Sequence, residues 1–360
     1  MVLIWRPQGL VQAGVARRQD TRDEVKATGH AVKLPASLGW PLATLAVIVA
    51  VFIPLGVTDN GIMSGLVIAA ILFMTLMGLD VLMGYAGQVS LGQAGFMAIG
   101  GYTSGYLAIN TDIAPVLSIL AGIGVSLTCA LVLSVVTLRL RGLYLALATL
   151  AFGLLIDSCA VGFLDITGGP SGLVGIPSFS VAGFTFASPR AMYYLVLALD
   201  VIILIALVGA MRSGFGRALK AIRSDQMAAA ALGINTVRTK LAAFMISVTL
   251  ASLAGSLYAF FFNFLAPEMV GTSRSLELVA MLIIGGESTL VGGLFGALLL
   301  TLLPVIFAPL AIYKTSASGA LLVSSFLYLP QGIYGALIQI VTRLGGARGA
   351  KPAKAEVLVS

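Results

Sequence analysis

Long apolar runs separated by short polar segments decide what this chain can fold into. Ten such runs follow one another, at 38–57, 62–83, 93–109, 115–138, 143–163, 191–211, 241–263, 275–287, 289–312 and 318–341. Most contain the roughly 20 residues that an α-helix needs to cross a bilayer, although two of the ten are short. Only 10% of the 360 residues are charged, against about 25% in a soluble domain. The sequence therefore predicts an all-α, polytopic helical membrane protein with about eight to ten transmembrane helices.

Basic residues indicate that both ends of the chain are cytoplasmic. With ten spans, the cytoplasmic segments are 1–37, 84–92, 139–142, 212–240, the turn near 288, and 342–360. These segments hold 18 of the 21 lysines and arginines, which is the asymmetry that orients membrane proteins. It also accounts for the net charge of +7, so we expect no nucleic acid among the partners.

This topology gives the chain three parts. A basic cytoplasmic tail at 1–37 precedes a transmembrane domain at 38–341, and a second cytoplasmic tail follows at 342–360. Spans two to five and seven to ten begin on opposite sides, so an inverted repeat of the kind found in transporters is a possible arrangement. The outer segment 164–190 is rich in Gly, Pro and Ser and is expected to be a loop that either meets a partner or simply connects two spans.

The polar segment 212–240 is the largest cytoplasmic loop inside the membrane domain. It carries six basic residues and one acid. Ser224 or Asp225 can cap a short helix with the body QMAAAAL, which Gly233 then ends. A compact alanine-rich helix of this kind can enter a groove on another protein. The alternative is a helix lying passively at the membrane surface.

Two polar interruptions of apolar sequence are candidates for a solute path. In GYAGQVSLGQAGF at 84–96, the residues Gln88, Ser90 and Gln93 could line a wet cavity, because irregular backbone at membrane depth needs polar partners. In IGGESTLVGGLFG at 284–296, the candidates are Glu287, Ser288 and Thr289. The alternatives are an ordinary cytoplasmic turn for the first and a helix cap at the cytoplasmic interface for the second.

The sequence offers no catalytic or metal site. A phosphate-binding G-x-x-x-x-G-K-[ST] loop, a G-x-S-x-G nucleophile and an H-E-x-x-H zinc site are all absent. The two cysteines, Cys129 and Cys159, lie in apolar runs, and the one histidine is in the N-terminal tail, so we expect no metal. Asp80, Asp157, Asp200 and Glu277 lie in or near spans and would have to converge to form a proton or sodium relay.

Several long blocks of the sequence, in the right order, resemble one family. They are GYAGQVSLGQAGFMAIGGYTSGYLA at 84–108, VTLRLRGLYLALATLAFG at 136–153, TGGPSGLVGIP at 167–177, GRALKAIRSDQMAAAALGINTVRTKLAAFMISVTLASLAGSLYAF at 216–260 and IGGESTLVGGLFGALLLTLLP at 284–304. Together they cover about 84–341. The chain resembles the permease subunit of bacterial ABC importers of the branched-chain amino-acid type.

The resemblance implies a second permease subunit, two cytoplasmic ATPases that bind ATP and Mg, and an extracytoplasmic solute-binding protein, in the bacterial inner membrane. It implies no enzyme activity and no cofactor in this chain. It also implies that one segment is the coupling helix that enters the ATPase: Ser224, Asp225, Gln226, Met227, Ala228, Ala229, Ala230, Ala231, Leu232, Gly233, Ile234 and Asn235. The family's usual acid beside the alanines is replaced here by Ala229 or Ala230, and Glu287, Ser288 and Thr289 stand where the family more often has a neutral turn.

The solute implied by the resemblance is a branched-chain or other hydrophobic amino acid. Relatives that import urea, amides or aromatic acids are the first alternative. A self-sufficient carrier driven by sodium or protons is the second, and it would depend on an intramembrane acid such as Asp157 or Glu287.

Overall fold

The computed structural model describes residues 51–54, 56, 59–111, 113–137, 140, 142–181 and 183–306. The predicted tails 1–37 and 342–360, the predicted run 318–341 and most of the run 38–57 lie outside these residues.

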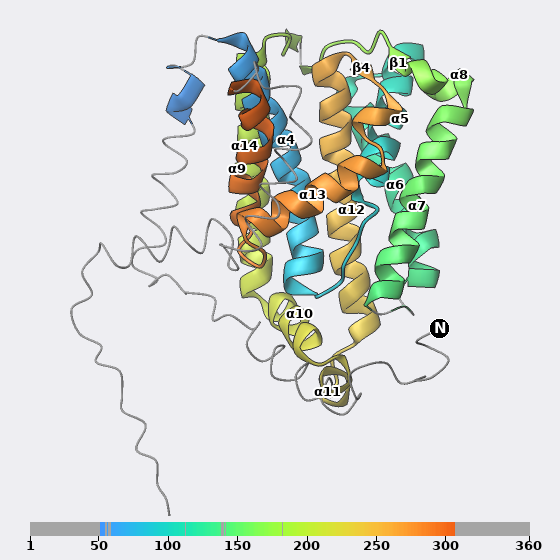
Figure 1. Ribbon diagram of the computed structural model, residues 1–360, viewed down its shortest axis with the longest axis vertical. Helices are drawn as coiled ribbons and strands as arrows, with labels where there is room; N and C mark the ends of the chain where they lie inside the picture. Colours follow the sequence, from blue (N-terminus) through green and yellow to red (C-terminus); the bar gives the residue numbers. More distant parts are fainter. Residues whose placement is uncertain are drawn as a thin grey trace, which may run out of the picture.

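Five helices in the described part of the chain are long and apolar enough to cross a membrane. They are α4 (Asn60–Asp80), which continues as the π-helical segment η1 (Val81–Tyr85), α6 (Pro115–Thr137), α7 (Leu143–Gly162), α9 (Pro189–Arg212) and α12 (Thr236–Phe262). Apolar runs of this length form helices in lipid because every backbone N–H and C=O group must be satisfied within the segment. The protein is thus an all-α polytopic membrane protein, as the sequence predicted (Figure 1).

Three of the predicted runs form shorter helices. These are α5 (Gln93–Asn110), α13 (Thr272–Gly285) and α14 (Gly292–Ile306). Figure 1 shows α13 lying obliquely across the bundle, whereas α4 and α12 run along it. The runs at 93–109 and 275–287, which the sequence marked as short, form helices of 18 and 14 residues, and neither helix is among the five that are both long and apolar enough to cross a membrane.

The core is built around α4 and α12. Buried residues make up 94% of the apolar window of α4 and 67% of that of α12. The corresponding values for α6, α7 and α9 are only 28%, 28% and 22%, so these helices present most of their apolar surface to lipid or to another subunit. The most extensive helix contact joins α12 to α5, through small residues. There, a Cβ atom on Gly100 or Gly255 would collide with the backbone of the facing helix.

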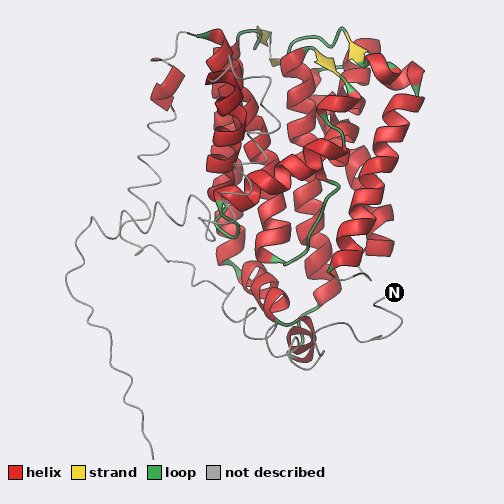
Figure 2. Ribbon diagram, viewed as in Figure 1, coloured by secondary structure: helices red, strands yellow, loops and turns green. Residues whose placement is uncertain are grey.

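Short elements cover the two ends of the bundle differently. One end carries α8 (Leu164–Thr167), η2 (Gly169–Ser171), η3 (Pro267–Met269) and four two-residue strands: β1 (Leu173–Val174), β2 (Ser180–Val181), β3 (Phe184–Thr185) and β4 (Phe264–Leu265). β1 pairs antiparallel with β4, and β2 with β3 (Figure 2). The segment 164–190, which was predicted to be a loop, contains α8, η2, three of the two-residue strands and the first residues of α9, joined by short irregular stretches.

The opposite end carries α10 (Gly214–Ser224) and α11 (Gln226–Ala231). Figure 1 shows both beneath the long helices, with α11 the farther from the bundle. This is the basic loop 212–240, where α11 is the short helix that the sequence predicted and α10 is a second helix before it.

The structure changes the description of two segments that were predicted to be cytoplasmic turns. The stretch 86–92 runs within the bundle beside α12 (Figure 1), with Gln88, Ser90 and Gly92 buried. The turn near 288 packs against the end of α4, where Leu290 is buried and Glu287 is exposed. Sequence polarity alone did not separate an exposed turn from an irregular segment enclosed by helices.

Candidate functional site

The short helix α11 has the capped structure that its sequence predicted. Asp225 Oδ1 accepts hydrogen bonds from the backbone N–H groups of Met227, at 2.7 Å, and Ala228, at 3.1 Å. Gly233 follows the helix with φ +85°, a conformation that glycine adopts without the strain imposed by a Cβ atom. Asn235 then caps α12, since its Oδ1 accepts from the N–H of Arg238 at 3.0 Å.

The outer face of α11 is apolar and exposed. Met227 is 72% exposed and Leu232, directly after the helix, is 81% exposed. Ala229 on the opposite side is buried, and Gln226 Oε1 accepts a hydrogen bond from Lys240 Nζ of α12 at 2.7 Å. The helix is therefore fixed to the bundle on one side and offers two large apolar side chains on the other.

Arg223, at the end of α10, connects this helix pair to the membrane core. Its Nη2 lies 2.7 Å from Glu287 Oε1, and its Nη1 donates to the carbonyl of Gly84 and to Ser288 Oγ. Gly84 belongs to η1, and the other two residues form the turn between α13 and α14. A guanidinium presents several N–H donors in one rigid plane, so it can hold three separate acceptors at once. A second contact supports this one, because Lys220 of α10 lies over the ring of Tyr85 in η1, 5.4 Å from its centroid.

Asp80 holds the same turn from inside the bundle. Its side chain is buried, and its two oxygens accept from the backbone N–H groups of Ser288, at 2.6 Å, and Leu290, at 2.8 Å. Both of those residues have positive φ values, +66° and +57°, in which non-glycine residues are strained. Ser288 Oγ donates to Gly84 O at 2.7 Å. Arg223, Glu287, Ser288, Asp80 and Gly84 together are called the polar junction below.

The polar junction joins three parts of the chain that are far apart in sequence. It connects the end of α4, the turn between α13 and α14, and the helix pair α10–α11. A displacement of α11 would consequently be transmitted to α4 and α13 through hydrogen bonds rather than through lipid.

The segment between η1 and α5 is the second polar region inside the bundle and is called the break below. It comprises residues 86–92, which follow the π-helical turn η1 and have no regular structure. The N–H of Leu91 donates to Thr149 Oγ1 of α7 at 2.9 Å, and the N–H of Ala94 donates to Ser275 Oγ of α13 at 3.0 Å. Gly92 passes so close to α7 that a Cβ atom there would lie 2.5 Å from Thr149 O.

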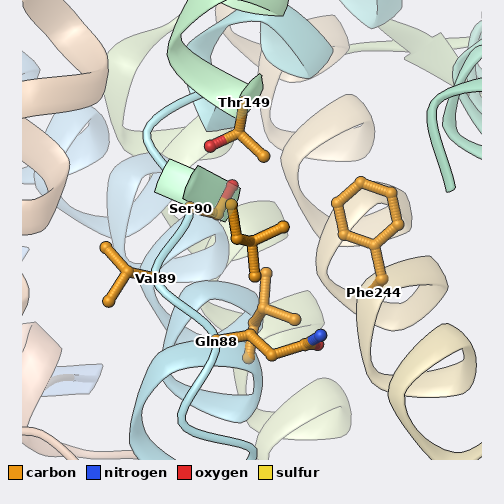
Figure 3. A pocket seen from close by; sticks show the side chains of 7 residues that line it. Gln88, Val89, Ser90, Thr149 and Phe244 are labelled. Atoms are coloured by element: carbon orange, nitrogen blue, oxygen red, sulfur yellow. The ribbon is translucent and has the colours of Figure 1, made fainter. Parts of the chain in front are cut away.

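A small cavity adjoins the break. It is lined by Leu82, Gln88, Val89, Ser90, Leu145, Thr149 and Phe244, and its volume is about 10 Å³, enough for one water molecule (Figure 3). Gln93 Nε2 donates to Ser90 Oγ at 3.5 Å, which places Gln93 next to the same group. A larger hollow of about 500 Å³ lies among α6, α9 and α12, but apart from Thr249 its lining is apolar, which suits a lipid chain better than a polar solute.

The six predicted path residues thus fall into two separate places. Gln88, Ser90 and Gln93 come together at the break. Glu287, Ser288 and Thr289 lie in the turn between α13 and α14, where Glu287 and Ser288 join the polar junction and Thr289 Oγ1 accepts from Gly292 N and donates to Gly286 O. Arg223 and Thr149 were missed as functional residues, and Asp80 was considered only for an ion relay. Their partners are far away in the sequence, at 64 positions for Arg223 and Glu287, 210 for Asp80 and Leu290, and 58 for Thr149 and Leu91.

The acids considered for a proton or sodium relay have separate structural contacts. Asp157 Oδ2 accepts from the N–H and the hydroxyl of Thr272 at the start of α13, at 2.7 and 2.5 Å. Glu277 pairs with Arg274 at 2.7 Å, and Asp80 belongs to the polar junction. Asp200 is buried in α9 with no hydrogen-bond partner for its Oδ1. Among the described residues, no three His, Cys, Asp or Glu side chains gather in a metal-type cluster.

The comparison with known families matches most of this membrane domain. Residues 61–338 match the family described as branched-chain amino acid transport system / permease component. The chain belongs to this permease family. The match includes α11, the polar junction and the break, so all three are parts of the family domain.

Individual relatives agree with this assignment. The high-affinity branched-chain amino acid transport system permease protein LivM of Salmonella typhimurium is 31% identical over 281 residues, which cover 71% of this chain and 66% of the relative. LivM of Escherichia coli is 30% identical over 285 residues with the same coverage. LivH of Escherichia coli, from the same kind of transport system, is 31% identical over 125 residues, 34% of this chain and 40% of that relative. The permease chain thus spans just under two thirds of the LivM proteins, and no solved structure matches it significantly.

Proposed function

We propose that this chain is the transmembrane permease subunit of an ATP-driven importer in the bacterial inner membrane, and that it carries branched-chain or other hydrophobic amino acids. The observation that carries the proposal is α11, a capped helix outside the bundle whose exposed Met227 and Leu232 are connected to the membrane core by Arg223. Membership of the branched-chain amino acid permease family supports the proposed role as a permease subunit.

In this mechanism the chain supplies half of a solute path and has no ATPase of its own. Residues 224–235 form the coupling helix, which docks on one of two cytoplasmic ATPase subunits that bind ATP and Mg. A second permease completes the path, and an extracytoplasmic binding protein delivers the solute to the end that carries the β1–β4 and β2–β3 pairs. Movement of the ATPases shifts α11, and the polar junction transmits that shift to α4 and α13.

Substitutions at the coupling helix test the proposal. Ala230→Glu adds a charge on an exposed position of α11. Gly233→Pro disrupts the turn after it, because proline cannot adopt the φ of +85° and lacks the N–H that donates to Ala230 O. Met227→Ala removes an exposed apolar side chain that is 72% accessible, and Val132→Ala in α6, where Val132 is 70% exposed, is the matched control away from the loop. The measurements are co-purification of the ATPase with the tagged permease and ATP-dependent L-leucine uptake by the assembled complex in proteoliposomes.

The expected result is that the three loop variants lose ATPase co-purification and uptake together, while Val132→Ala retains both. Wild-type uptake by all three loop variants would exclude the coupling role. Uptake of L-leucine against a gradient by the chain alone would exclude the importer-subunit proposal altogether.

A further inference from the structure

The break between η1 and α5 leaves hydrogen-bonding groups of both kinds unused inside the bundle. Gln88 is 6% exposed and Gln93 is 1% exposed, and the Oε1 atoms of both are buried without a hydrogen-bond partner. A buried amide oxygen without a donor is uncommon in a native protein and calls for an explanation such as an unseen ligand. Ser90, between them in sequence, is also buried and is linked to Gln93 through its hydroxyl.

Donors are unused at the same place. Among the described residues, the backbone N–H groups of Val89, Ser90, Gly92 and Gln93 make no hydrogen bond. Gly92 is the N-cap of α5, a helix of 18 residues, and Gln93 is its first residue. The next N–H group, that of Ala94, is already bound to Ser275 Oγ. The N-terminus of a helix carries a partial positive charge, which favours an anionic group at that point.

In the described part of the chain, the cavity beside the break holds no compensating charge, and Arg223, whose side chain lies against Gly87 of the break, already binds Glu287, Gly84 and Ser288. Among the described residues, no charged side chain lines the cavity beside the break. The polar residues in its lining are Gln88, Ser90 and Thr149 (Figure 3). Thr149 Oγ1 is already satisfied, because it accepts from Leu91 N and donates to Ala146 O. A ligand with a net charge would thus be poorly compensated, whereas a ligand with both a positive and a negative group finds acceptors for one and donors for the other.

We propose that the break binds the zwitterionic head of an amino acid, with the carboxylate at the unpaired N–H groups that begin α5 and the ammonium at Gln88 Oε1 and Gln93 Oε1. This site deepens the proposed function, on which it rests, by naming the chemical group that the permease itself recognises. It disfavours two of the alternative solutes: aromatic acids bring a net negative charge with no cation to meet it, and urea or simple amides bring no carboxylate for the N-terminus of α5.

The structure shows this site closed. The cavity holds only about one water molecule, and Phe244 of α12 and Leu145 of α7 form two of its walls. A solute enters once α7 or α12 moves away from the break. Val89 is 38% exposed and belongs to the cavity lining, so it reports on access to the site.

A cysteine at this position provides the test. The two native cysteines, Cys129 and Cys159, are free thiols and are first replaced by alanine. Val89→Cys is then introduced, and the assembled complex in proteoliposomes is labelled with a hydrophilic maleimide. The labelling rate is measured alone and with L-leucine, with 4-methylpentanoate, which lacks the ammonium, and with 3-methylbutylamine, which lacks the carboxylate.

L-Leucine is expected to slow the labelling, and neither analogue should do so at the same concentration. Gln88→Leu and Gln93→Leu should raise the L-leucine concentration that halves the labelling rate by roughly 10- to 100-fold, the effect of one lost hydrogen bond to a charged group. Thr75→Val is the matched control, because Thr75 is another fully buried residue whose hydroxyl has no partner, within α4. It should leave the concentration unchanged.

A second substitution covers the case in which the leucine variants fail to fold. Gln88→Glu keeps the acceptor and adds a negative charge, so it should make 3-methylbutylamine protective. If the complex imports L-leucine but L-leucine does not slow labelling of Val89→Cys, or if either analogue protects as well as L-leucine does, this site proposal is wrong and the importer proposal stands. A complex that imports no amino acid at all overturns the importer proposal instead.

Discussion

The guanidinium of Arg223 and the carboxylate of Glu287 lie 2.7 Å apart and join the loop that holds α11 to the turn between α13 and α14. Both side chains are partly exposed, at 39% and 46%, so the ion pair by itself contributes only about 0–1 kcal/mol to stability. Its importance lies in what Arg223 also holds, namely the carbonyl of Gly84 and the hydroxyl of Ser288.

Replacement of Arg223 should weaken the coupling between α11 and the membrane helices more than it lowers the stability of the protein. In Arg223→Ala the three acceptors lose their shared donor, so movement of α11 is transmitted less completely to α4 and α13. We expect the solute to stimulate ATP hydrolysis less in this variant, which corresponds to a loss of about 0.5–2 kcal/mol in the free energy that couples the two sites. The thermal midpoint of the purified complex should change little. Arg223→Lys should recover only part of the effect, because an ammonium lacks the planar fork of donors.

The control for this substitution is on the same helix. Arg217→Ala removes a similar charge whose one described contact is with the backbone of Arg212 at 3.4 Å. If Arg217→Ala and Arg223→Ala reduce stimulation equally, positive charge on α10 matters and the polar junction does not.

Asp80 should be required for the fold of the turn near 288. In Asp80→Ala the N–H groups of Ser288 and Leu290 lose a buried acceptor, at about 1.5–3 kcal/mol for each hydrogen bond to a charged group. Thermal unfolding of the detergent-solubilised protein should therefore occur several degrees lower. Asp59→Ala is the comparison: it removes the exposed cap of α4, which typically costs about 1 kcal/mol. A midpoint for Asp80→Ala at or above that for Asp59→Ala would contradict the assigned role.

Gly92 should tolerate no side chain. A Cβ atom at this position would meet the carbonyl oxygen of Thr149, so Gly92→Ala must push α5 away from α7 at a cost of roughly 1–3 kcal/mol. Gly124→Ala in α6 is the paired control, because no atom lies within 4 Å of the added methyl and alanine favours a helix by up to about 1 kcal/mol. Denaturation midpoints of the two variants should move in opposite directions, and equal shifts would refute the close contact.

The sequence predicted α11 from local signals, but it did not predict the polar junction. Asp225 and Gly233 lie within a few residues of the groups they cap, so their roles can be inferred from spacing alone. Asp80 and Leu290 are 210 positions apart, and nothing near either residue indicates the other. Glu287 was recognised as unusual, but its partner Arg223 depends on how α10 packs beneath α4. The break was noticed because its glycines and glutamines interrupt an apolar run, yet its enclosure by α7 and α12 required the structure.

Asp157 offers a test between the importer and a carrier driven by an ion gradient. An ion-coupled carrier would need this carboxylate to bind a proton or sodium, so Asp157→Asn should abolish its transport. In the structure, however, Asp157 Oδ2 accepts from the backbone N–H and the hydroxyl of Thr272 and thereby caps α13. Asparagine keeps one acceptor oxygen there, so ATP-dependent L-leucine uptake by the assembled complex should survive in Asp157→Asn, with a lowered thermal midpoint.

A double-mutant cycle separates capping from ion binding at the same residue. Asp157→Ala and Thr272→Val should each destabilise the protein, and the double variant should lose less than the sum by about 0.5–3 kcal/mol, because both substitutions remove one shared contact. Strictly additive midpoint shifts would exclude the contact. If Asp157→Asn stopped uptake while leaving the thermal midpoint unchanged, the carboxylate would have a transport role that capping does not explain, and the ion-driven mechanism would become the better account.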